Sequence, residues 1–362
     1  MNKKRICFIA QFPPPIHGLS KAVETLYNSR LADEFDLEKV DITNNKRILS
    51  NLLKIWKSKA DLFYFTISQS KGGNLRDLAI LKLLEKQKKK CIIHLHGGYY
   101  RQLVDHDLPD WQKKANYNAI SKIAGAIVLG PSLKWIFQGM LPEEKIFTVP
   151  NCIENEYLMS EEEFEKKEQT ITERRIKHIL YLSNFMKSKG YREVLEMIKL
   201  EKERVDAGQV RKFHFDFAGQ FFEKEEEEFF RSYIKQNQIE KYITYHGVVS
   251  GDEKRKLFRQ CDVFILLSRN EGQPISILEA MGNGYIIITT NCGGIPDIVE
   301  DKKNGIIVSM PIQTKAIYDR LFQYNDSEIM TIQKYNRQLS ATRYIESSYI
   351  DNMTKVFKSY YT

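Results

Sequence analysis

The chain of 362 residues lacks any apolar run that approaches the roughly 20 residues of a membrane-spanning helix. The apolar part of its first segment, MNKKRICFIAQFPPP, is too short for a secretory signal peptide, so we expect a cytoplasmic protein. Cysteine is also scarce: the five cysteines are odd in number, widely spaced and without a C-x-x-C pair. We therefore expect neither a disulfide framework nor a zinc site, and the thiols should be reduced and buried.

Internal repeats of solenoid length and low-complexity tails are absent, which excludes repeat architectures. The 42% apolar and 28% charged residues are typical of a globular protein, and the length allows two domains with a core each. The formal net charge of +8 is unevenly placed. Residues 1–150 hold 24 Lys and Arg against 14 Asp and Glu, whereas the other residues hold 31 against 33, so the basic excess belongs to the first half.

A basic half-molecule is compatible with nucleic acid, an anionic lipid or a phosphorylated substrate. We do not expect nucleic acid, because the usual binding motifs are missing and cations at a helix carboxyl end explain much of the densest cluster, KQKKK at 86–90. The stretch LSNLLKIWKSKA places Lys54, Lys57 and Lys59 around Trp56 in an amphipathic pattern that fits a peripheral contact with an anionic membrane. A helix packed on its own sheet would show a similar pattern.

Short β-like runs alternate with helical stretches along the chain. The runs are RICFIA, LFYFTI, CIIHLHG and GAIVLG in the first half, and HILYLS, FHFDFAG, ITYHG, DVFILLS, YIIITT and GIIVSM in the second. This alternation predicts an α/β protein with two parallel, doubly wound, Rossmann-like domains. Residues 154–178, rich in Glu and Lys, look least structured, and we place the domain boundary near residue 172.

The segment 268–299, SRNEGQPISILEAMGNGYIIITTNCGGIPDIV, carries the strongest chemical signal. The apolar run before it predicts a buried parallel strand that delivers Glu271 and Gly272 to the carboxyl edge of a sheet, where ligands of open α/β sheets bind. Pro274 predicts a helix that starts there or one residue later. The amino end of such a helix suits a diphosphate, and the carboxylates of Glu271 and Glu279 then suit sugar and ribose hydroxyls.

A plainer interpretation makes Glu271 a first-turn helix acid and Glu279 a solvated residue, but other segments argue against it. EGQPISILEAM resembles the signature of glycosyltransferase family four, a group of retaining enzymes with the GT-B fold. VPNCIENEYL at 149–158 resembles the segment of that family that passes between domains, and LYLSNFMKSKGYREVL at 180–195 resembles its phosphate-binding strand and loop. The likeness covers nearly the whole chain in the right order.

The resemblance implies a GT-B fold: two Rossmann-like, doubly wound domains that face each other across a cleft. We expect an acceptor-binding domain over residues 1–172, a donor-binding domain over 173–340, and a C-terminal helix over 341–362 that crosses back to the first domain. The implied reaction transfers a sugar, with retention, from a nucleotide-diphosphate sugar to a hydroxyl of a glycan or lipid-linked glycan. A UDP-sugar is the favoured donor and a GDP-sugar the next.

Bacterial surface polysaccharide biosynthesis is the commonest context of such chains, so we expect a cytoplasmic enzyme that can work at the inner face of the membrane. The nucleotide sugar is a substrate, and no cofactor is expected. No metal is expected either, because Lys189 and a helix dipole can supply the positive charge.

The resemblance also implies roles for individual residues. His96 would hydrogen-bond the transferred sugar, Lys189 would pair with the diphosphate, and Glu271 would hold sugar hydroxyls. Glu279 would take ribose hydroxyls. The other implied donor-binding positions are Gly18, Leu19, Asn184, Gly219, Gly247, Val248, Gly272, Gln273, Pro274, Ser276, Ile277 and Leu278. His17, beside the first of these, could face either substrate.

One position departs from the family pattern. Five residues before Lys189, where the family usually has an arginine, this chain has Asn184, and that change removes a fixed positive charge. His94 and His96 lie on one side of a strand end and would suit a metal, but further ligands are not evident. Two other functions stay open: a catalytically weak or inactive GT-B partner subunit, and a GT-B enzyme of another reaction type, such as an epimerase or phosphorylase.

Overall fold

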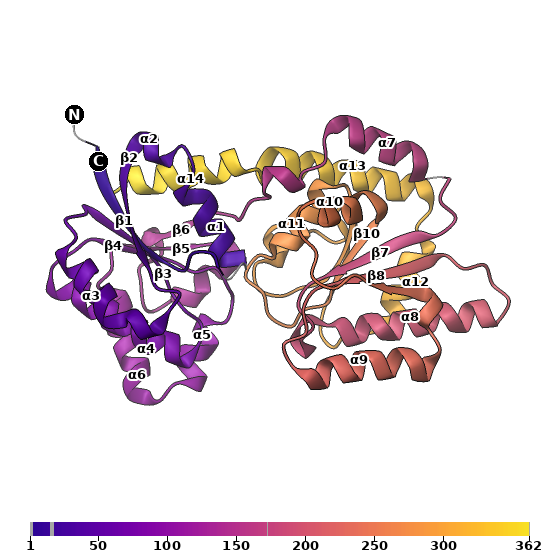
Figure 1. Cartoon of the computed structure of the whole chain (residues 1–362), viewed down its shortest axis with the longest axis horizontal. Coiled ribbons are helices and arrows are strands. Elements are labelled where there is room, and N and C mark those ends of the chain that lie inside the picture. Colours follow the sequence, from indigo (N-terminus) through magenta and orange to yellow (C-terminus); the bar gives the residue numbers. More distant parts are fainter. Residues whose placement is uncertain (1–2, 15–17, 172, 362) are drawn as a thin grey trace. The chain divides into compact units, whose positions relative to one another are not determined.

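The structure of the protein, a computed structural model, describes residues 3–14, 18–171 and 173–361. The chain divides into two compact units, each with a sheet and a core of its own (Figure 1). The pieces of unit 1 are Met1–Cys152, Glu271–Gln273 and Glu346–Thr362, and the pieces of unit 2 are Ile153–Asn270 and Pro274–Ile345.

Unit 1 is built on a six-stranded parallel sheet with the order β2-β1-β3-β4-β5-β6. Its strands are β1 (Lys4–Ala10), β2 (Phe35–Asp41), β3 (Leu62–Thr66), β4 (Cys91–His94), β5 (Gly125–Val128) and β6 (Ile146–Thr148). Its helices are α1 (Gly18–Tyr27), α2 (Leu31–Glu34), α3 (Ile48–Lys57), α4 (Lys71–Lys86), α5 (Tyr100–Gln102), α6 (Asp110–Ser121) and α14 (Glu346–Lys358), with short helical turns η1 (Asn45–Arg47), η2 (Leu103–Asp107), η3 (Pro131–Phe137) and η4 (Glu143–Lys145). The helices cover both faces of the sheet (Figure 1).

Alternate residues of each central strand of unit 1 enter cores on opposite faces of the sheet, as the period of two requires. In β1, Cys7 and Ile9 belong to one core, and Phe8 belongs to the other. Helix α14 fills the second core with Phe357, whose ring lies 6.2 Å from the ring of Phe8 and 5.7 Å from that of Tyr64. The last helix of the chain is therefore an integral part of unit 1.

The sequence analysis missed two strands of unit 1. Strand β2 has the sequence FDLEKVD, in which buried residues are separated by charged ones, and β6 has only three residues. Both lie at the edges of the sheet, where one side of the strand is unpaired and a continuous apolar run is not needed.

Unit 2 contains the second six-stranded parallel sheet, with the order β12-β11-β10-β7-β8-β9. Its strands are β7 (Lys177–Leu182), β8 (Phe213–Ala218), β9 (Ile243–Tyr245), β10 (Val263–Leu266), β11 (Ile286–Thr290) and β12 (Gly305–Val308). Its helices are α7 (Glu161–Ile171), α8 (Tyr191–Asp206), α9 (Lys224–Asn237), α10 (Gly251–Gln260), α11 (Ile275–Gly282), α12 (Thr314–Gln323) and α13 (Asp326–Arg343), with turns η5 (Asn155–Tyr157), η6 (Lys187–Lys189), η7 (Glu240–Tyr242) and η8 (Ile295–Asp297). All six apolar runs predicted for the second half form these strands.

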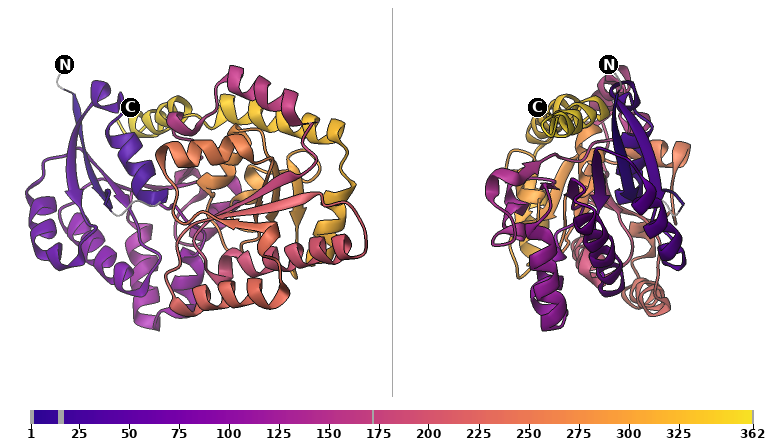
Figure 2. Two further views of the ribbon diagram at one scale, coloured as in Figure 1. Left: turned by 45° about the vertical axis from the view of Figure 1, so that its right-hand side comes forward. Right: turned by 90° about the vertical axis from the view of Figure 1, so that its left-hand side faces the viewer.

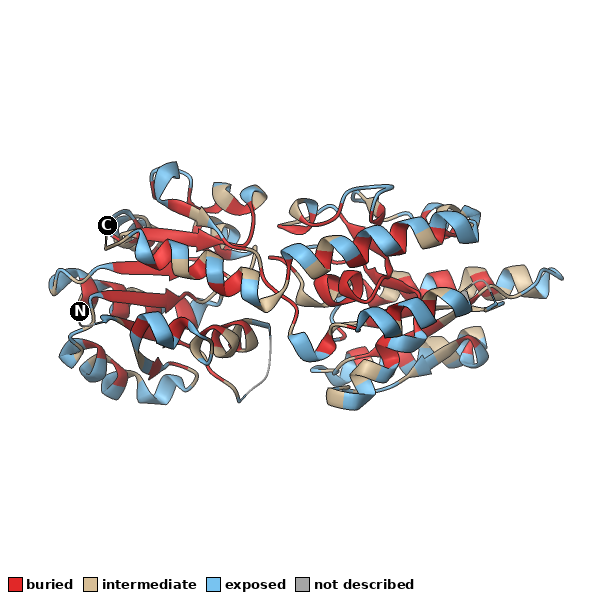
Figure 3. Cartoon of the chain, turned by 90° about the horizontal axis from the view of Figure 1, so that it is seen from above, coloured by how far each residue is buried: buried red, intermediate tan, exposed pale blue. Residues whose placement is uncertain are grey.

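The views of Figure 2 again place helices on both sides of each sheet, and Figure 3 shows that buried residues concentrate in the strands of each unit. The five cysteines are free thiols, of which four are buried and Cys292 is half-buried. Every helix in the described part of the chain is too short or too polar to span a bilayer.

The division between the units differs from the predicted boundary at residue 172, which itself lies outside the described residues. Unit 2 begins at Ile153, because α7 packs on unit 2. The buried Lys167 of α7 donates to the carbonyl oxygens of Phe258 and Asn283 at 3.3 and 3.1 Å. The charged stretch that looked unstructured is thus helical, with one face buried.

The return of the chain to unit 1 also differs slightly from the predicted start at residue 341. Helix α13 runs on to Arg343, and unit 1 resumes at Glu346, the first residue of α14. The C-terminal segment that belongs with the first half of the chain is therefore a single helix and its end.

Candidate functional site

The loop after β10 leads into α11, which begins at Ile275, as predicted from the proline before it. Pro274 is the N-cap residue, and its carbonyl oxygen accepts from the amides of Ile277 and Leu278 at 3.1 and 3.4 Å. The amides of Ile277 and Leu278, two of the implied donor-binding positions, are thus engaged by the helix itself. The amides of Ile275 and Ser276 precede the first intrahelical bond and are the ones that such a helix end offers to an anion.

Glu279 lies in the second turn of α11 and is only 2% exposed. Its Oε1 accepts a hydrogen bond from Lys254 Nζ of α10 at 2.7 Å. Burial raises the pKa of Glu279, and the charge of Lys254 opposes that rise. Glu279 is therefore a buried, paired carboxylate and not the solvated helix residue of the plainer interpretation. The sequence analysis missed Lys254, since nothing in GDEKRK distinguishes it from its neighbours.

Gly272 packs against main chain of unit 1, to which Glu271–Gln273 belongs. A Cβ at this position would lie 2.6 Å from the carbonyl oxygen of His96 and 2.7 Å from the Cα of Gly97. Only glycine fits so close to backbone atoms, so protein packing already explains this glycine. Glu271 beside it is half-buried.

Gln273 is 4% exposed, and its carboxamide is used within unit 1. Its Oε1 accepts from the amide of Asn151 at 2.7 Å, and its Nε2 donates to the carbonyl oxygen of Leu129 at 3.1 Å. The side chain of Asn151 in turn donates to the carbonyl oxygen of Gln273 at 2.9 Å. The side chain of Gln273 thus fixes the loop rather than pointing away from the protein.

His96 follows β4, and its ring lies against that of His94, with the ring centroids 3.9 Å apart and the ring planes inclined at 36°. His94 is fully buried, and its Nδ1 hydrogen-bonds the hydroxyl of Tyr64 at 2.8 Å. Burial, together with the neighbouring His96, holds the pKa of His94 well below its usual range. No further histidine, cysteine or carboxylate completes a metal-binding group with these two rings within the described ranges.

Gly18 and Leu19 begin α1, directly after the loop that follows β1. Gly18 is exposed, and Leu19 packs at the margin of the core shared with α14. His17 lies outside the described residues.

Lys189 and Asn184 lie between β7 and α8 of unit 2, the first half-buried and the second exposed. Gly190, which follows Lys189, has φ +73°, and a Cβ there would lie 2.2 Å from the carbonyl oxygen of Leu267. The turn that carries Lys189 therefore sits against the carboxyl end of β10.

Gly219 and Gly247 follow β8 and β9, and the amide of Gly219 donates to the carbonyl oxygen of Gly247 at 2.8 Å. Gly219 has φ +148°, and a Cβ on it would lie 1.9 Å from the carbonyl oxygen of Ser183. Val248 beside Gly247 is 67% exposed. Within unit 2, the predicted donor-binding residues thus gather at the carboxyl ends of β7, β8, β9 and β10, which is where doubly wound sheets bind ligands.

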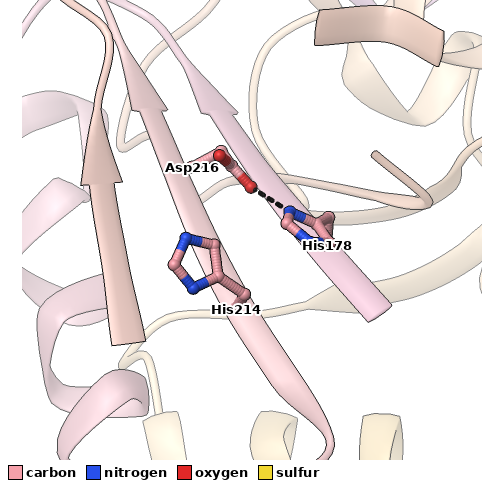
Figure 4. A group of neighbouring side chains, drawn as sticks. All are labelled: His178, His214 and Asp216. Atoms are coloured by element: carbon pink, nitrogen blue, oxygen red, sulfur yellow. Dashed lines mark hydrogen bonds and ion pairs between the residues drawn. The ribbon is translucent and has the colours of Figure 1, made fainter. Parts of the chain in front are cut away.

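Three side chains on one face of the unit 2 sheet have the spacing of metal ligands: His178 of β7, and His214 and Asp216 of β8. Their ligand atoms lie within 4.8 Å of one another (Figure 4). The dashed line in Figure 4 joins Nδ1 of His178 to Oδ2 of Asp216, at 2.7 Å. The other oxygen of Asp216 is 2.8 Å from Nε2 of His246.

Protein groups already engage the nitrogens of His214 as well. Its Nε2 lies 2.8 Å from the hydroxyl of Thr244, and its Nδ1 lies 2.6 Å from the guanidinium of Arg211. A guanidinium at hydrogen-bonding distance repels a metal cation, and each carboxylate oxygen of Asp216 already lies within hydrogen-bonding distance of an imidazole nitrogen. The arrangement is best described as a hydrogen-bonded network around a buried carboxylate.

The sequence model of one protein family, described as "Glycosyl transferases group 1", matches residues 161–341, half of the chain. The chain belongs to the glycosyl transferases group 1. The matched region contains the turn of Lys189, the two glycines after β8 and β9, and all of α11. The predicted family relationship is thereby confirmed at the level of this group.

The known proteins most like this glycosyl transferase include two bacterial relatives. It is 23% identical over 300 residues to an "Uncharacterized 41.2 kDa protein in cps region" of Klebsiella pneumoniae, a match that covers 80% of this chain and 76% of that protein. It is 34% identical over 84 residues to WcaL of Salmonella typhimurium, named for colanic acid biosynthesis, but this match covers only 22% of the chain and 21% of WcaL.

Among solved structures, Anabaena HepE in complex with UDP and glucose has a TM-score of 0.72 with this chain. The superposition covers 98% of this chain and 100% of HepE at 14% sequence identity. With two parallel six-stranded sheets, the fold is GT-B, as expected.

This group 1 chain also contains a D-x-D string, the metal-binding pattern of the other main transferase fold, which the sequence analysis missed. It spans Asp105–Asp107 in the turn η2. Asp105 pairs with Arg101 at 2.5 Å and Lys113 at 3.1 Å, and Asp107 accepts from the hydroxyl of Tyr99 at 2.6 Å. Cations of the protein thus neutralise one carboxylate, and the other is hydrogen-bonded.

Proposed function

We propose that this protein is a retaining glycosyltransferase that moves a sugar from a UDP-sugar to a hydroxyl of a glycan or lipid-linked glycan in bacterial surface polysaccharide biosynthesis. The observation that carries the proposal is the strand, loop and helix around α11, where a helix amino end follows β10 and a buried carboxylate, Glu279, stands one turn further on. HepE, which shares the fold, binds UDP and glucose, and the two relatives named for cps and colanic acid support the context.

The proposed donor site uses unit 2 for the nucleotide. Lys189 neutralises the diphosphate as charge develops on it, and the amino end of α11 adds the amide of Ser276. Glu279 accepts from ribose hydroxyls, and the main chain around Gly219 and Gly247 frames the base. Because lysine and helix dipole supply the positive charge, we expect catalysis to be independent of a divalent metal.

We assign the hydroxyls of the transferred sugar to His96 and Glu271, the residues to which the resemblance gives this role. No carboxylate is assigned as a nucleophile, so we propose front-face transfer. The acceptor hydroxyl then attacks the anomeric carbon from the side that the nucleotide leaves, its proton passes to the leaving phosphate, and configuration is retained. A trapped glycosyl-enzyme adduct would contradict this mechanism.

The test is a thermal-shift panel of UDP, GDP, dTDP and ADP, with and without magnesium, on wild type and on Glu279→Ala. A ligand at 100 times its dissociation constant stabilises the folded state by about 2.7 kcal/mol. We expect one large shift, with UDP, that magnesium does not change and that the variant loses. A shift only with another nucleotide would replace the donor, and no shift at all would favour an inactive GT-B subunit, for which Asn184 is the one sequence hint.

Product analysis separates transfer from other GT-B reactions. With the identified donor, a transferase releases nucleoside diphosphate faster when acceptor is added and forms a product larger than the acceptor. An epimerase converts the donor without acceptor, and a phosphorylase depends on inorganic phosphate.

We also propose that α3 of unit 1 makes a peripheral contact with anionic membrane at the cytoplasmic side. One face of α3 packs on its own unit through the fully buried Ile55. The opposite face exposes Leu49, Leu53 and Trp56 at 80%, 50% and 55%, with the spacing of one helix face. Packing on the sheet therefore accounts for Ile55 but leaves an apolar stripe beside Lys54 and other cations, which fits a lipid surface.

Vesicle sedimentation tests this contact. Wild type should bind vesicles with 30% phosphatidylglycerol and not vesicles of phosphatidylcholine alone. Replacement of Leu53 and Trp56 by serine should abolish binding, whereas serine at Leu75, equally exposed on α4 at 54%, should not. Equal binding by all variants would contradict the assignment.

A further inference from the structure

The carboxylate of Glu279 has one strong partner. Lys254 Nζ lies 2.7 Å from Oε1, while the second oxygen, Oε2, has no hydrogen-bonding partner among the described residues. The side chains are 3% exposed for Glu279 and 15% for Lys254. A buried ion pair of this kind fixes the orientation of both groups, since either charge left alone would be costly.

Lys254 is itself held from two sides. Its ammonium lies 4.0 Å from the ring centroid of Tyr157 and 5.6 Å from that of Phe258, distances at which an aromatic face attracts a cation. The hydroxyl of Tyr157 accepts from the amide of Gly251, the first residue of α10. The lysine therefore has little freedom to swing away from Glu279.

The segment that carries Tyr157 is tied to the end of α11. Asn283, the C-cap of α11, donates through Nδ2 to the carbonyl oxygens of Tyr157 and Glu279 at 2.8 and 2.7 Å. Its Oδ1 accepts from the amide of Met159 at 3.2 Å. Turn η5, α10 and α11 thus form one rigid support for the ion pair.

The charges that face Glu279 come from two elements. Lys254 lies on α10, and Glu154 and Glu156 lie at η5. Burial raises the pKa of Glu279, the two glutamates raise it further, and Lys254 lowers it. Arg255 is engaged with Glu156 at 3.4 Å. Lys254 is therefore the group that opposes protonation of Glu279.

We propose that Lys254 is a positioning residue for nucleotide binding: it holds one oxygen of Glu279 and keeps the carboxylate ionised, so that Oε2 accepts a ribose hydroxyl. The proposal rests on the proposed function of the Glu279 site. It assigns to α10, which the sequence resemblance did not implicate, a part in recognising the nucleoside. A hydrogen bond from a hydroxyl to an ionised carboxylate is about twice as strong as one to a neutral acid, so ionisation decides affinity.

Calorimetric titration with UDP between pH 6.0 and 8.5 tests the proposal on wild type, Lys254→Met, Lys254→Arg and Lys256→Met. Lys256 is exposed on the same helix and is the matched control. At each pH the measured quantity is the ratio of the variant dissociation constant to that of wild type, which cancels titration of UDP itself. For Lys254→Met we expect the ratio to rise as pH falls, to at least about tenfold at pH 6.5.

The other two variants show whether the effect of Lys254→Met comes from the loss of the positive charge at this position. Lys254→Arg should restore a ratio within about threefold of one at every pH, because the charge is kept. Lys256→Met should match wild type. A ratio for Lys254→Met that stays near one, or that is large but the same at every pH, would overturn the proposal, since a merely structural lysine would act equally across pH.

A double variant, Lys254→Met with Glu279→Gln, covers the case in which Lys254→Met does not fold, because it leaves no uncompensated charge. We expect it to fold, to bind UDP at least about tenfold more weakly than wild type, and to show a constant ratio across pH. Binding as tight as wild type would overturn the proposal. If wild type binds none of the nucleotides, the proposed function fails instead, which the same titrations distinguish.

Discussion

The substitution Gly219→Ala should destabilise unit 2 strongly, through both backbone strain and a clash. Gly219 has φ +148°, in a region that is essentially reserved for glycine, and the added Cβ would lie 1.9 Å from the carbonyl oxygen of Ser183. A sparsely populated backbone conformation costs about 1–3 kcal/mol. Displacement of packed main chain adds about 1–3 kcal/mol, so the total is about 2–6 kcal/mol.

Gly208→Ala provides the control for strain without a clash. Gly208 has φ +84°, but nothing lies within 4 Å of the position that an added Cβ would take. Its cost should therefore be limited to the backbone strain, about 1–2 kcal/mol. The difference between the two variants isolates the contact with Ser183.

Scanning calorimetry measures both variants against wild type. Since 1 kcal/mol shifts the Tm of a 150–250-residue domain by about 2–4 °C, we expect a fall of about 5–20 °C for Gly219→Ala and of only a few degrees for Gly208→Ala. Equal falls in the two variants would refute the steric part of the reasoning. An unchanged Tm for Gly219→Ala would refute the backbone geometry at the end of β8.

Three further substitutions test other contacts, each by urea unfolding. The pKa of Asp216 falls to about 2, because hydrogen bonds from His178 and His246 outweigh the opposing effect of burial. Its contribution, about 2–3 kcal/mol, is present above the unfolded pKa and is lost as pH falls from about 4 to 2, so Asp216→Asn should lose that part of the acid sensitivity. Gln273→Ala, which leaves the amide of Asn151 and another buried group unpaired, should cost about 1–3 kcal/mol. Phe357→Ala, which removes a fully buried ring from the core under α14, should cost about 3–5 kcal/mol. An Asp216→Asn protein with unchanged acid sensitivity, or losses below about 0.5 kcal/mol for the other two, would contradict these assignments.

The fold was predictable wherever burial on both faces of a strand leaves a continuous apolar run. DVFILLS and YIIITT have no other plausible location than the centre of a parallel sheet, and they form β10 and β11. Edge strands are harder to predict in this way, because in β2 only Phe35 and Val40 are buried and the residues between them are mostly charged. The domain boundary was misplaced for a related reason: EEEFEKKEQTI has the composition of a charged linker, although Phe164 and Lys167 bury one side of α7.

At the candidate site, the motif predicts some features and leaves others undetermined. A motif fixes residue types and the order of strand, loop and helix, so the start of α11 could be predicted to within one residue from Pro274. The motif does not show which of its residues the fold needs for its own packing and hydrogen bonds. Gly272 and Gln273 fit the motif, yet the first is required by the approach of main chain near His96 and the second by hydrogen bonds within unit 1.

Contacts between residues far apart in the sequence are the part that no local pattern contains. Lys254 lies 25 residues before Glu279, and the residues on both sides of it are charged as well. Only the contact of Lys254 with Glu279 across α10 and α11 therefore distinguishes it from Lys256. A buried carboxylate nevertheless stays ionised only if a compensating group lies near it, because burial without such a group favours the protonated, neutral form. From the motif alone one can therefore infer that Glu279 has a cationic partner if it is buried, and only the structure supplies both that burial and the identity of the partner.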